Sequence, residues 1–298
     1  MKRDCPHCHS GKNTCTKFGF FKRKSDGRTL ARFKCRSCLK TFSQASFQKC
    51  YWQKKRHLNP RIFELFCSGV SQRRIAQLLH VSRNTVVRKF IFLALQAREN
   101  NMKLLLKSSL VEDLQFDDLE TFEHSKLKPL SVTLAVENKT RKILGFKVSQ
   151  MPAKGLLAKA SRKKYGFRED HRKKARELLF EEIKPKIHPR AYILSDQNPH
   201  YPESVRKYFP SAHHETTPGR RGCVTGQGEL KEGGWDPLFS LNHTCAMLRA
   251  NINRLFRRTW CTTKLPERLS HHIELYVYYH NTIIIKSSLT RACTHLTI

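Results

Sequence analysis

Two pairs of cysteines near the N-terminus restrict the folding of this chain more than any other feature of its sequence. Cys5 and Cys8 are separated by two residues, and Cys35 and Cys38 repeat that spacing. Each Cys-x2-Cys turn presents two thiolates to one ion, and two such turns complete a closed tetrahedral site that folds a segment too small to hold itself together. The pattern predicts a zinc ribbon over residues 1–50, with structural Zn²⁺ bound by all four thiolates.

The other cysteines indicate a reducing compartment rather than a disulfide framework. The chain contains 11 Cys, an odd number, and no apolar secretory signal follows the opening residues. We therefore expect a cytoplasmic protein. Cys15 and Cys50 are spare, and His7 or His9 could replace a thiolate if the metal site were shifted.

The charge of the chain points to a polyanionic partner. Lys and Arg number 57 against 24 Asp and Glu, which gives a net charge of +33 at pH 7, and such a chain attracts nucleic acid. Residues 1–110 contain only the acids Asp4, Asp26, Glu64 and Glu99. No apolar run approaches the roughly 20 residues that a membrane span needs. We expect basic targeting modules ahead of a larger working domain that begins near residues 105–112.

A helical pattern behind the ribbon predicts a helix-turn-helix domain over residues 51–108. Ser71 is placed to cap a helix with Ile75 on its inward side, Val81 fills the turn, and Ser82 caps the next helix. The first turn of that next helix would read base edges, and later basic residues would contact phosphates. The alternative is a three-helix unit that does not touch DNA. The expected base contacts are Arg83, Asn84 and Thr85, and the expected phosphate contacts are Arg88 and Lys89.

The pattern then changes to strand-like runs joined by short polar connections. Residues 114–122, 129–136 and 140–148 predict an antiparallel meander that opens a mixed sheet. After a basic segment, Lys154 to Arg176, the apolar run 191–196 predicts another strand. We expect this basic segment to be an insertion or an exposed helix that binds DNA.

Two acids on these strands are the candidate catalytic residues. Asp117 lies in the first run and Asp196 ends the fourth. Asp118 competes with Asp117, and strand alternation favours Asp117. Carboxylates brought together on neighbouring strands repel each other unless a divalent cation lies between them, so the pair predicts Mg²⁺ or Mn²⁺ with oxygen ligands.

An apolar stripe from Leu241 to Leu255 predicts a later helix that borders this site. Asn242, Arg249 and Asn253 would share a face beside the stripe. That face could border a shallow site, and Arg249 on it is a candidate DNA contact. The histidine pairs His213-His214 and His271-His272 are expected on the surface or facing DNA.

These motifs, in this order, resemble the DDE-type transposases of bacterial insertion sequences, in the group that carries a zinc ribbon and a helix-turn-helix before an RNase H-like domain. The resemblance implies a multi-domain chain whose residues 109–298 form an α/β RNase H-like mixed sheet with helices. Asp117 and Asp196 match the family's first and second metal-binding acids. The third position departs, because Asn242 stands where members often carry Glu seven residues before a basic residue. The resemblance therefore implies Asn242 as the third metal ligand. Acids just upstream could take its place, namely Glu229, Glu232 and Asp236, with Glu232 as the reserve ligand. The motifs on which this resemblance rests are the cysteine pairs, Phe116-Asp117-Asp118-Leu119-Glu120-Thr121-Phe122, Ser195-Asp196, the run Leu248 to Trp260, and Thr262-Thr263-Lys264.

The function implied by the resemblance is cleavage and joining of DNA strands by two-metal phosphoryl transfer. The protein would bind the terminal inverted repeats and target of its element as a homo-oligomer on double-stranded DNA, in the bacterial nucleoid and without a membrane. Alternatives are a non-enzymatic zinc and helix-turn-helix regulator, a decayed transposase that keeps only end binding, and a nuclease of the same fold that cuts without joining.

Overall fold

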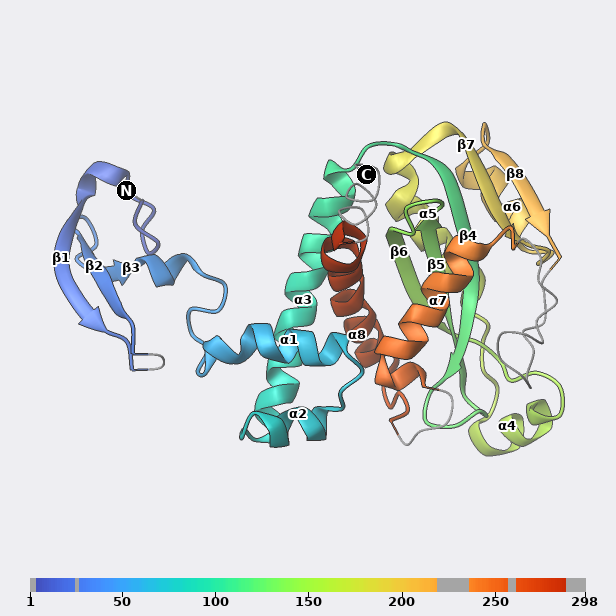
Figure 1. Cartoon of the computed structure of the whole chain (residues 1–298), viewed down its shortest axis with the longest axis horizontal. Coiled ribbons are helices and arrows are strands. Elements are labelled where there is room, and N and C mark those ends of the chain that lie inside the picture. The colour runs from blue at the N-terminus through green and yellow to red at the C-terminus, as the bar shows by residue number, and fades with distance from the viewer. Residues whose placement is uncertain (1–3, 25–26, 219–235, 257–260, 288–298) are drawn as a thin grey trace, which may run out of the picture. The chain divides into compact units, whose positions relative to one another are not determined.

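The computed structural model describes residues 4–24, 27–218, 236–256 and 261–287 (Figure 1). The chain separates into two compact units, Met1–Arg61 and Ile62–Ile298. Within the described residues, no helix combines the length and apolar character that crossing a membrane requires.

The first unit is a small three-stranded antiparallel sheet with little apolar core. Its strands are β1 (Cys15–Lys22), β2 (Thr29–Cys35) and β3 (Thr41–Ser43), in that spatial order. Short 3₁₀ turns cover Lys12–Thr14, Gln44–Phe47 and Arg56–Leu58. The buried hydrophobic residues among those described in this unit are Cys5, Cys35, Phe42 and Ala45. A core this small explains why the unit needs another source of folding energy.

Three helices follow, and the caps predicted from the sequence are confirmed. They are α1 (Asn59–Cys67), α2 (Gln72–Leu78) and α3 (Arg83–Lys107). The Ser71 hydroxyl accepts from the Arg74 N–H at 3.3 Å, and the Ser82 hydroxyl accepts from the Thr85 N–H at 3.2 Å. Each cap satisfies an N–H that the first helical turn leaves without a partner.

The long helix α3 ties these helices to the rest of the second unit. It lies beside α8 (Pro266–Tyr279), as Figure 1 shows. The rings of Phe66 and Phe90 pack 4.7 Å apart, and both contact the imidazole of His272. His272 is fully buried and bonds the Phe66 carbonyl at 2.9 Å. Its expected surface position is therefore wrong: two aromatic rings and a carbonyl hold it as a core side chain.

The second unit is built on a five-stranded mixed sheet in the order β6-β5-β4-β7-β8. The predicted meander is confirmed: β4 pairs antiparallel with β5, and β5 with β6. Strand β7 then pairs parallel with β4, and β8 pairs parallel with β7. The strands are β4 (Val111–Phe122), β5 (Pro129–Glu137), β6 (Ile143–Gln150), β7 (Ile187–Asp196) and β8 (His213–Thr217).

Helices cover both faces of this sheet (Figure 1). On one face, Phe116 of β4 packs against Phe180 of α5 (Arg172–Ile183) and Tyr201 of α6 (Tyr201–Tyr208). On the other face, Gln115 bonds the backbone of the segment that enters α7 (Phe239–Asn251), through the Pro237 carbonyl at 2.8 Å and the Leu241 N–H at 3.0 Å. Gly145 lets α5 approach the sheet, because a Cβ there would lie 2.8 Å from Leu179.

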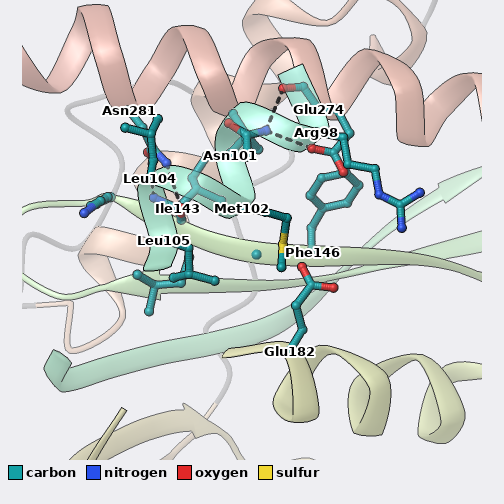
Figure 2. A pocket seen from close by; sticks show the side chains of 14 residues that line it. Arg98, Asn101, Met102, Leu104, Leu105, Ile143, Phe146, Glu182, Glu274 and Asn281 are labelled. Carbon is teal, nitrogen blue, oxygen red and sulfur yellow. Dashed lines mark hydrogen bonds between the residues drawn. The ribbon is translucent and has the colours of Figure 1, made fainter. Parts of the chain in front are cut away.

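The open edge of β6 is closed by side chains from α3 and from the π-helical turn His280–Ile284 that continues α8. Asn281 accepts from the Ile143 N–H at 3.0 Å and donates to its carbonyl at 2.8 Å, as a neighbouring strand would. Beside it lies a cavity of about 30 Å³, above which Asn101 donates to the Glu274 carboxylate at 2.8 Å (Figure 2). This volume is about that of one water molecule, so the cavity is no substrate site.

Two helical predictions need correction. The basic segment that begins at Lys154 is not one exposed helix: it forms α4 (Leu157–Tyr165) and the start of α5, whose Leu179, Phe180 and Ile183 belong to the core. The predicted helix to Leu255 ends at Asn251, because Ile252 has extended backbone and a 3₁₀ turn follows. Asn253 is consequently buried rather than on a face shared with Asn242.

Candidate active site and metal centre

The four predicted cysteine ligands come together in the first unit. The Sγ atoms of Cys5, Cys8, Cys35 and Cys38 all lie within 4.8 Å of one another. The Cys5–Cys38 and Cys8–Cys35 sulfur pairs are 3.6 and 3.7 Å apart. The cluster can hold a structural metal such as zinc, and because all four positions are protein ligands it is a closed site.

The two cysteine turns have matching backbone geometry. The Cys5 N–H donates to the Ser10 carbonyl at 3.0 Å, and the Cys35 N–H donates to the Lys40 carbonyl at 3.0 Å. His9 and Leu39, the residues after each pair, both have positive φ, 57° and 60°. Backbone N–H groups of Cys38 and Ser37 lower the pKa of the Cys35 thiol to about 5, which favours the thiolate that a metal requires. His7 and His9 are exposed and take no part in the cluster.

The second site is the pair of acids on β4 and β7. In the parallel register Gln115 lies opposite Leu194, so the same register two residues further places Asp117 opposite Asp196. Paired residues on parallel strands point to the same face of a sheet. The structure therefore brings together two acids that are far apart in the sequence.

The pKa values of both acids are raised, which means that their surroundings disfavour the ionised carboxylates. Burial, and next the charge of Asp196, raise the pKa of Asp117 to about 7, against the opposing bonds from the Asp118 N–H and the Tyr201 hydroxyl. Burial also raises the pKa of Asp196, opposed by the N–H of Asn198. A cation between the carboxylates would relieve both effects.

Asp118 is held differently from Asp117. Its Oδ1 accepts a short hydrogen bond from the Thr133 hydroxyl of β5, and its buried Oδ2 has no hydrogen-bond partner among the described residues. The charge of Asp118 nevertheless contributes to the raised pKa of Asp196. Asp118 thus lies within electrostatic reach of the pair and keeps one carboxylate oxygen available.

The amide of Asn242 is bonded to Asp236. This amide is exposed and donates to Asp236 Oδ2 at 2.9 Å, while Asp236 Oδ1 accepts from the Leu238 N–H at 3.0 Å at the start of α7. No hydrogen bond links Asn242 to Asp117 or Asp196 in the part of the chain that is described. Glu229 and Glu232 lie outside the described residues.

A side chain of α7 that lies within electrostatic reach of Asp117 is Cys245, one turn after Asn242. Burial and then the charge of Asp117 raise the pKa of the Cys245 thiol to about 12, and the charge of Arg249 opposes them. The α7 face toward Asp117 therefore carries a thiol, with Arg249 one turn further along. Among the described residues, only the cysteine cluster of the first unit gathers three or more His, Cys, Asp or Glu side chains whose ligand atoms lie within 4.8 Å of one another.

A buried network behind Asp117 was missed in the sequence. The Tyr201 hydroxyl donates to Asp117 Oδ1 at 3.0 Å. The guanidinium of Arg176 lies 4.9 Å from the centre of the Tyr201 ring and donates to Ser204 Oγ and the His200 carbonyl, both at 3.1 Å. The sequence did contain one indication of this network, Arg176 itself, because a basic residue on the apolar side of a core helix must be paired.

The edge strand β8 also carries a histidine that sequence reasoning placed on the surface. His214 is half-buried, bonds Ser195 Oγ at 2.9 Å, and stacks 6.2 Å from the Phe116 ring. Burial lowers the pKa of His214. The surface position expected for His214 is therefore wrong. Residues 213–217 form β8, which was not predicted, and β8 places this side chain against the strand that ends in Asp196.

The predicted DNA-contacting side chains differ in exposure. Arg83, Asn84 and Arg88 are exposed, whereas Thr85 is half-buried and its hydroxyl lies 2.9 Å from the hydroxyl of Ser82. Arg249 is half-buried. The prediction for Lys89 is wrong, because its side chain is only 4% exposed in the core side of α3.

An open cleft of about 400 Å³ lies at Asp196. Lys154, Arg172 and His200 line it together with Gln197, Asn198 and Pro199. Lys154 pairs with Glu120 at 2.7 Å, and Arg172 pairs with Asp170 at 2.6 Å. An acid beside basic side chains is a combination suited to a phosphodiester with its counter-cation.

The raised pKa of Asp117 gives a pH prediction. Between pH 3.8 and about 7 the folded protein keeps a proton on Asp117 that the unfolded chain has released, so stability falls as pH rises through this window. Asp117→Asn should abolish that loss and make the protein more stable at pH 8 by on the order of 2–4 kcal/mol. Urea unfolding at pH 4 and pH 8 without added divalent cation measures it. Equal gains at both pH values would contradict the assignment, and Glu112→Gln on the exposed start of β4 is the control.

No family model matches this chain, and no curated protein matches it at a significant level. The residues of the two sites are accordingly the basis on which its function has to be inferred.

Proposed function

We propose that this protein is an insertion-sequence transposase, which binds the terminal inverted repeats of its element and cleaves and transfers DNA strands with divalent cations. The observation that carries the proposal is the placement of Asp117 opposite Asp196 on adjacent parallel strands, each with a raised pKa. Perturbed acids at the end of a sheet, beside a basic cleft, are typical of a catalytic site.

The order of the sheet supports an RNase H-like catalytic domain. A three-stranded antiparallel meander, β4-β5-β6, is extended by two strands parallel to its first, with α5 and α6 in the connections. That is the arrangement expected from the resemblance to DDE-type transposases. It places the first acid in the central strand and the second at the end of the neighbouring one.

The acids fit the divalent cations that this chemistry uses. The donors are hard carboxylate oxygens, they repel each other when both are ionised, and the buried Oδ2 of Asp118 lacks a hydrogen-bond partner among the described residues. Asp117 and Asp196 would hold Mg²⁺ or Mn²⁺, with Asp118 able to take part. When bound, the cations activate the attacking hydroxyl and stabilise the leaving oxygen.

The chain's own residues then have defined tasks. Tyr201 fixes one oxygen of Asp117 and leaves the other for a ligand. Lys154, Arg172 and His200 line the cleft where the scissile strand would lie, and they would contact its phosphates. The closed cysteine site and the helix-turn-helix would hold the DNA ends, and pairing two ends requires at least two copies of the chain on DNA.

Recognition of the ends gives a prediction for α3. Arg83→Ala and Asn84→Ala should each reduce preference for the terminal repeat by about 1–3 kcal/mol, because these exposed side chains would read base edges. Arg88→Ala should weaken specific and random DNA alike and lower the salt dependence of binding. Fluorescence anisotropy with both DNAs at two salt concentrations measures this. If all three variants lose the same affinity for the repeat and for random DNA, α3 does not read the base sequence.

Cleavage of an end by the purified protein tests the proposal directly. The substrate is a labelled duplex carrying the repeat that flanks the coding sequence, with Mg²⁺, with Mn²⁺, or with neither. Metal-dependent nicking followed by strand joining supports a transposase. Nicking without joining indicates a nuclease of the same fold.

A second candidate is a DNA-binding regulator or a decayed transposase without catalysis. It is favoured by the exposed position of Asn242, whose amide is bonded to Asp236, and by the absence, among the described residues, of a group of three or more His, Cys, Asp or Glu side chains at the acidic pair. Specific end binding with no cleavage in either metal supports this candidate.

A further inference from the structure

The arm between β6 and α5, residues 152–168, has a surface that the proposed function does not yet use. It contains six Lys and Arg and no acidic residue. Leu156 is fully exposed and Phe167 is 79% exposed. Exposed apolar side chains of this size on a strongly basic segment mark a binding surface.

The arm forms a groove of about 480 Å³, whose lining includes Pro152, Ala153, Phe167 and Arg168. The cationic side chains Lys159, Arg162 and Lys163 also line it. The groove therefore offers an aromatic ring and apolar walls for a flat group, and ammonium and guanidinium groups for phosphates.

Hydrogen bonds to the backbone of neighbouring segments hold the arm in place around this groove. The buried Ser161 hydroxyl donates to the Leu127 carbonyl at 2.6 Å, and Arg168 donates to the carbonyls of Met151 and Pro129 at 3.4 and 3.3 Å. α4 ends at Gly166, whose φ of 74° and ψ of −163° are accessible almost only to glycine. This turn places Phe167 outside the helix rather than against the sheet.

The groove lies at the same end of the sheet as the acids. β6 runs parallel to β4, because each is antiparallel to β5, so the arm leaves the sheet where β4 and β7 end. Figure 1 shows α4 at this end, beyond the helices that cover the sheet faces. Lys154, near the start of the arm, also lines the cleft at Asp196, so the arm begins beside that cleft.

We propose that the 152–168 arm binds a single-stranded stretch of DNA next to the scissile phosphate, with Phe167 stacking on an unpaired base. Duplex DNA hides the faces of its bases, so an exposed aromatic ring contributes little to binding it, whereas an unpaired base stacks on such a ring whatever its sequence. The inference rests on the proposed function for its location, since it assigns the strand that leaves the cleavage site.

The test is binding of the full chain to a fluorescent oligo(dT) and to a random-sequence duplex, without Mg²⁺ or Mn²⁺. Phe167→Ala should weaken oligo(dT) binding about tenfold and leave duplex binding within about twofold. Phe167→Trp should keep oligo(dT) binding, because the indole also stacks. Leu106→Ala, which removes an apolar side chain that is 59% exposed on α3, should change neither. Lys163→Gln should weaken both DNAs and reduce the salt dependence.

Unchanged oligo(dT) binding in Phe167→Ala, or equal losses on both DNAs, overturns the inference. So does a loss by Phe167→Ala of binding to phosphatidylserine vesicles while oligo(dT) binding persists, because the arm would then be a membrane contact. The assay needs no catalysis. If Phe167 contributes to oligo(dT) binding but the protein does not cleave DNA ends, this inference stands and the proposed transposase activity is refuted.

Discussion

Asp117→Asn and Asp196→Asn should each lower metal-dependent DNA cleavage by on the order of 10³-fold or more. Either change would remove a charged oxygen from the pair that we propose holds the cation, and both acids have a raised pKa. Binding to the DNA ends should change little, because the residues proposed to recognise them lie on α3 and not at the acidic pair. The measurement is single-turnover cleavage of a labelled end across a Mg²⁺ titration, alongside anisotropy with the same duplex.

The matched controls separate loss of a ligand from loss of structure. Glu112→Gln changes an exposed carboxylate on the same strand and should cleave normally. Asp117→Asn should be at least as stable as the parent at pH 8, so its inactivity would not reflect unfolding. Asn242→Ala and Asp236→Asn show whether the start of α7 supplies the missing ligand: a dead Asp236→Asn beside an active Asn242→Ala assigns Asp236. Cleavage that persists in both Asp117→Asn and Asp196→Asn would refute the proposed active site.

Removal of the metal from the cysteine cluster should unfold the first unit and leave the second one folded. The unit buries few hydrophobic side chains, whereas a structural zinc site contributes about 10–16 kcal/mol of apparent folding energy. Cys5→Ser or Cys38→Ser should therefore abolish stoichiometric zinc and the folded β1-β2-β3 sheet. Affinity for the terminal repeat should fall by on the order of 100-fold, since one of the two modules that we propose hold the DNA ends would be lost.

Cys15→Ser is the control for this result. Cys15 packs against the cluster but is not one of its four ligands, so this variant should keep its zinc and its repeat binding. Zinc content by atomic absorption, and amide chemical-shift dispersion of the full chain, are the two readouts. A Cys38→Ser protein that retains both a folded ribbon and full end binding would show that the metal is not needed.

The sequence was most informative where structure depends on near neighbours. The caps Ser71 and Ser82 could be predicted because a cap is a contact between residues three apart. The meander followed from strand-length apolar runs with short connections. In contrast, β8 was missed because its sequence, His213–Thr217, has no apolar alternation, and its pairing with β7 is what makes it a strand.

The same limit explains the errors in the site. Lys89 and His272 are polar residues that the sequence pattern assigns to the surface, but neighbouring helices cover them. The Tyr201 bond to Asp117 joins residues 84 positions apart, and no local pattern encodes it. Asn242 was selected by family spacing, whereas the helix orientation directs it to Asp236 and turns Cys245 toward the acids.

By itself the sequence determined the four cysteines of the metal cluster, the helix boundaries around the turn at Val81, the meander and the two acids, because each depends on residue type and short spacing. Only the tertiary structure decided that Asp117 and Asp196 lie opposite each other, since that follows from the parallel register of β4 and β7, between which lie β5, β6, α4 and α5. The physical reason is that register is set by burial of whole strand faces against α5, α6 and α7. Such burial is a property of the assembled sheet and not of any segment alone.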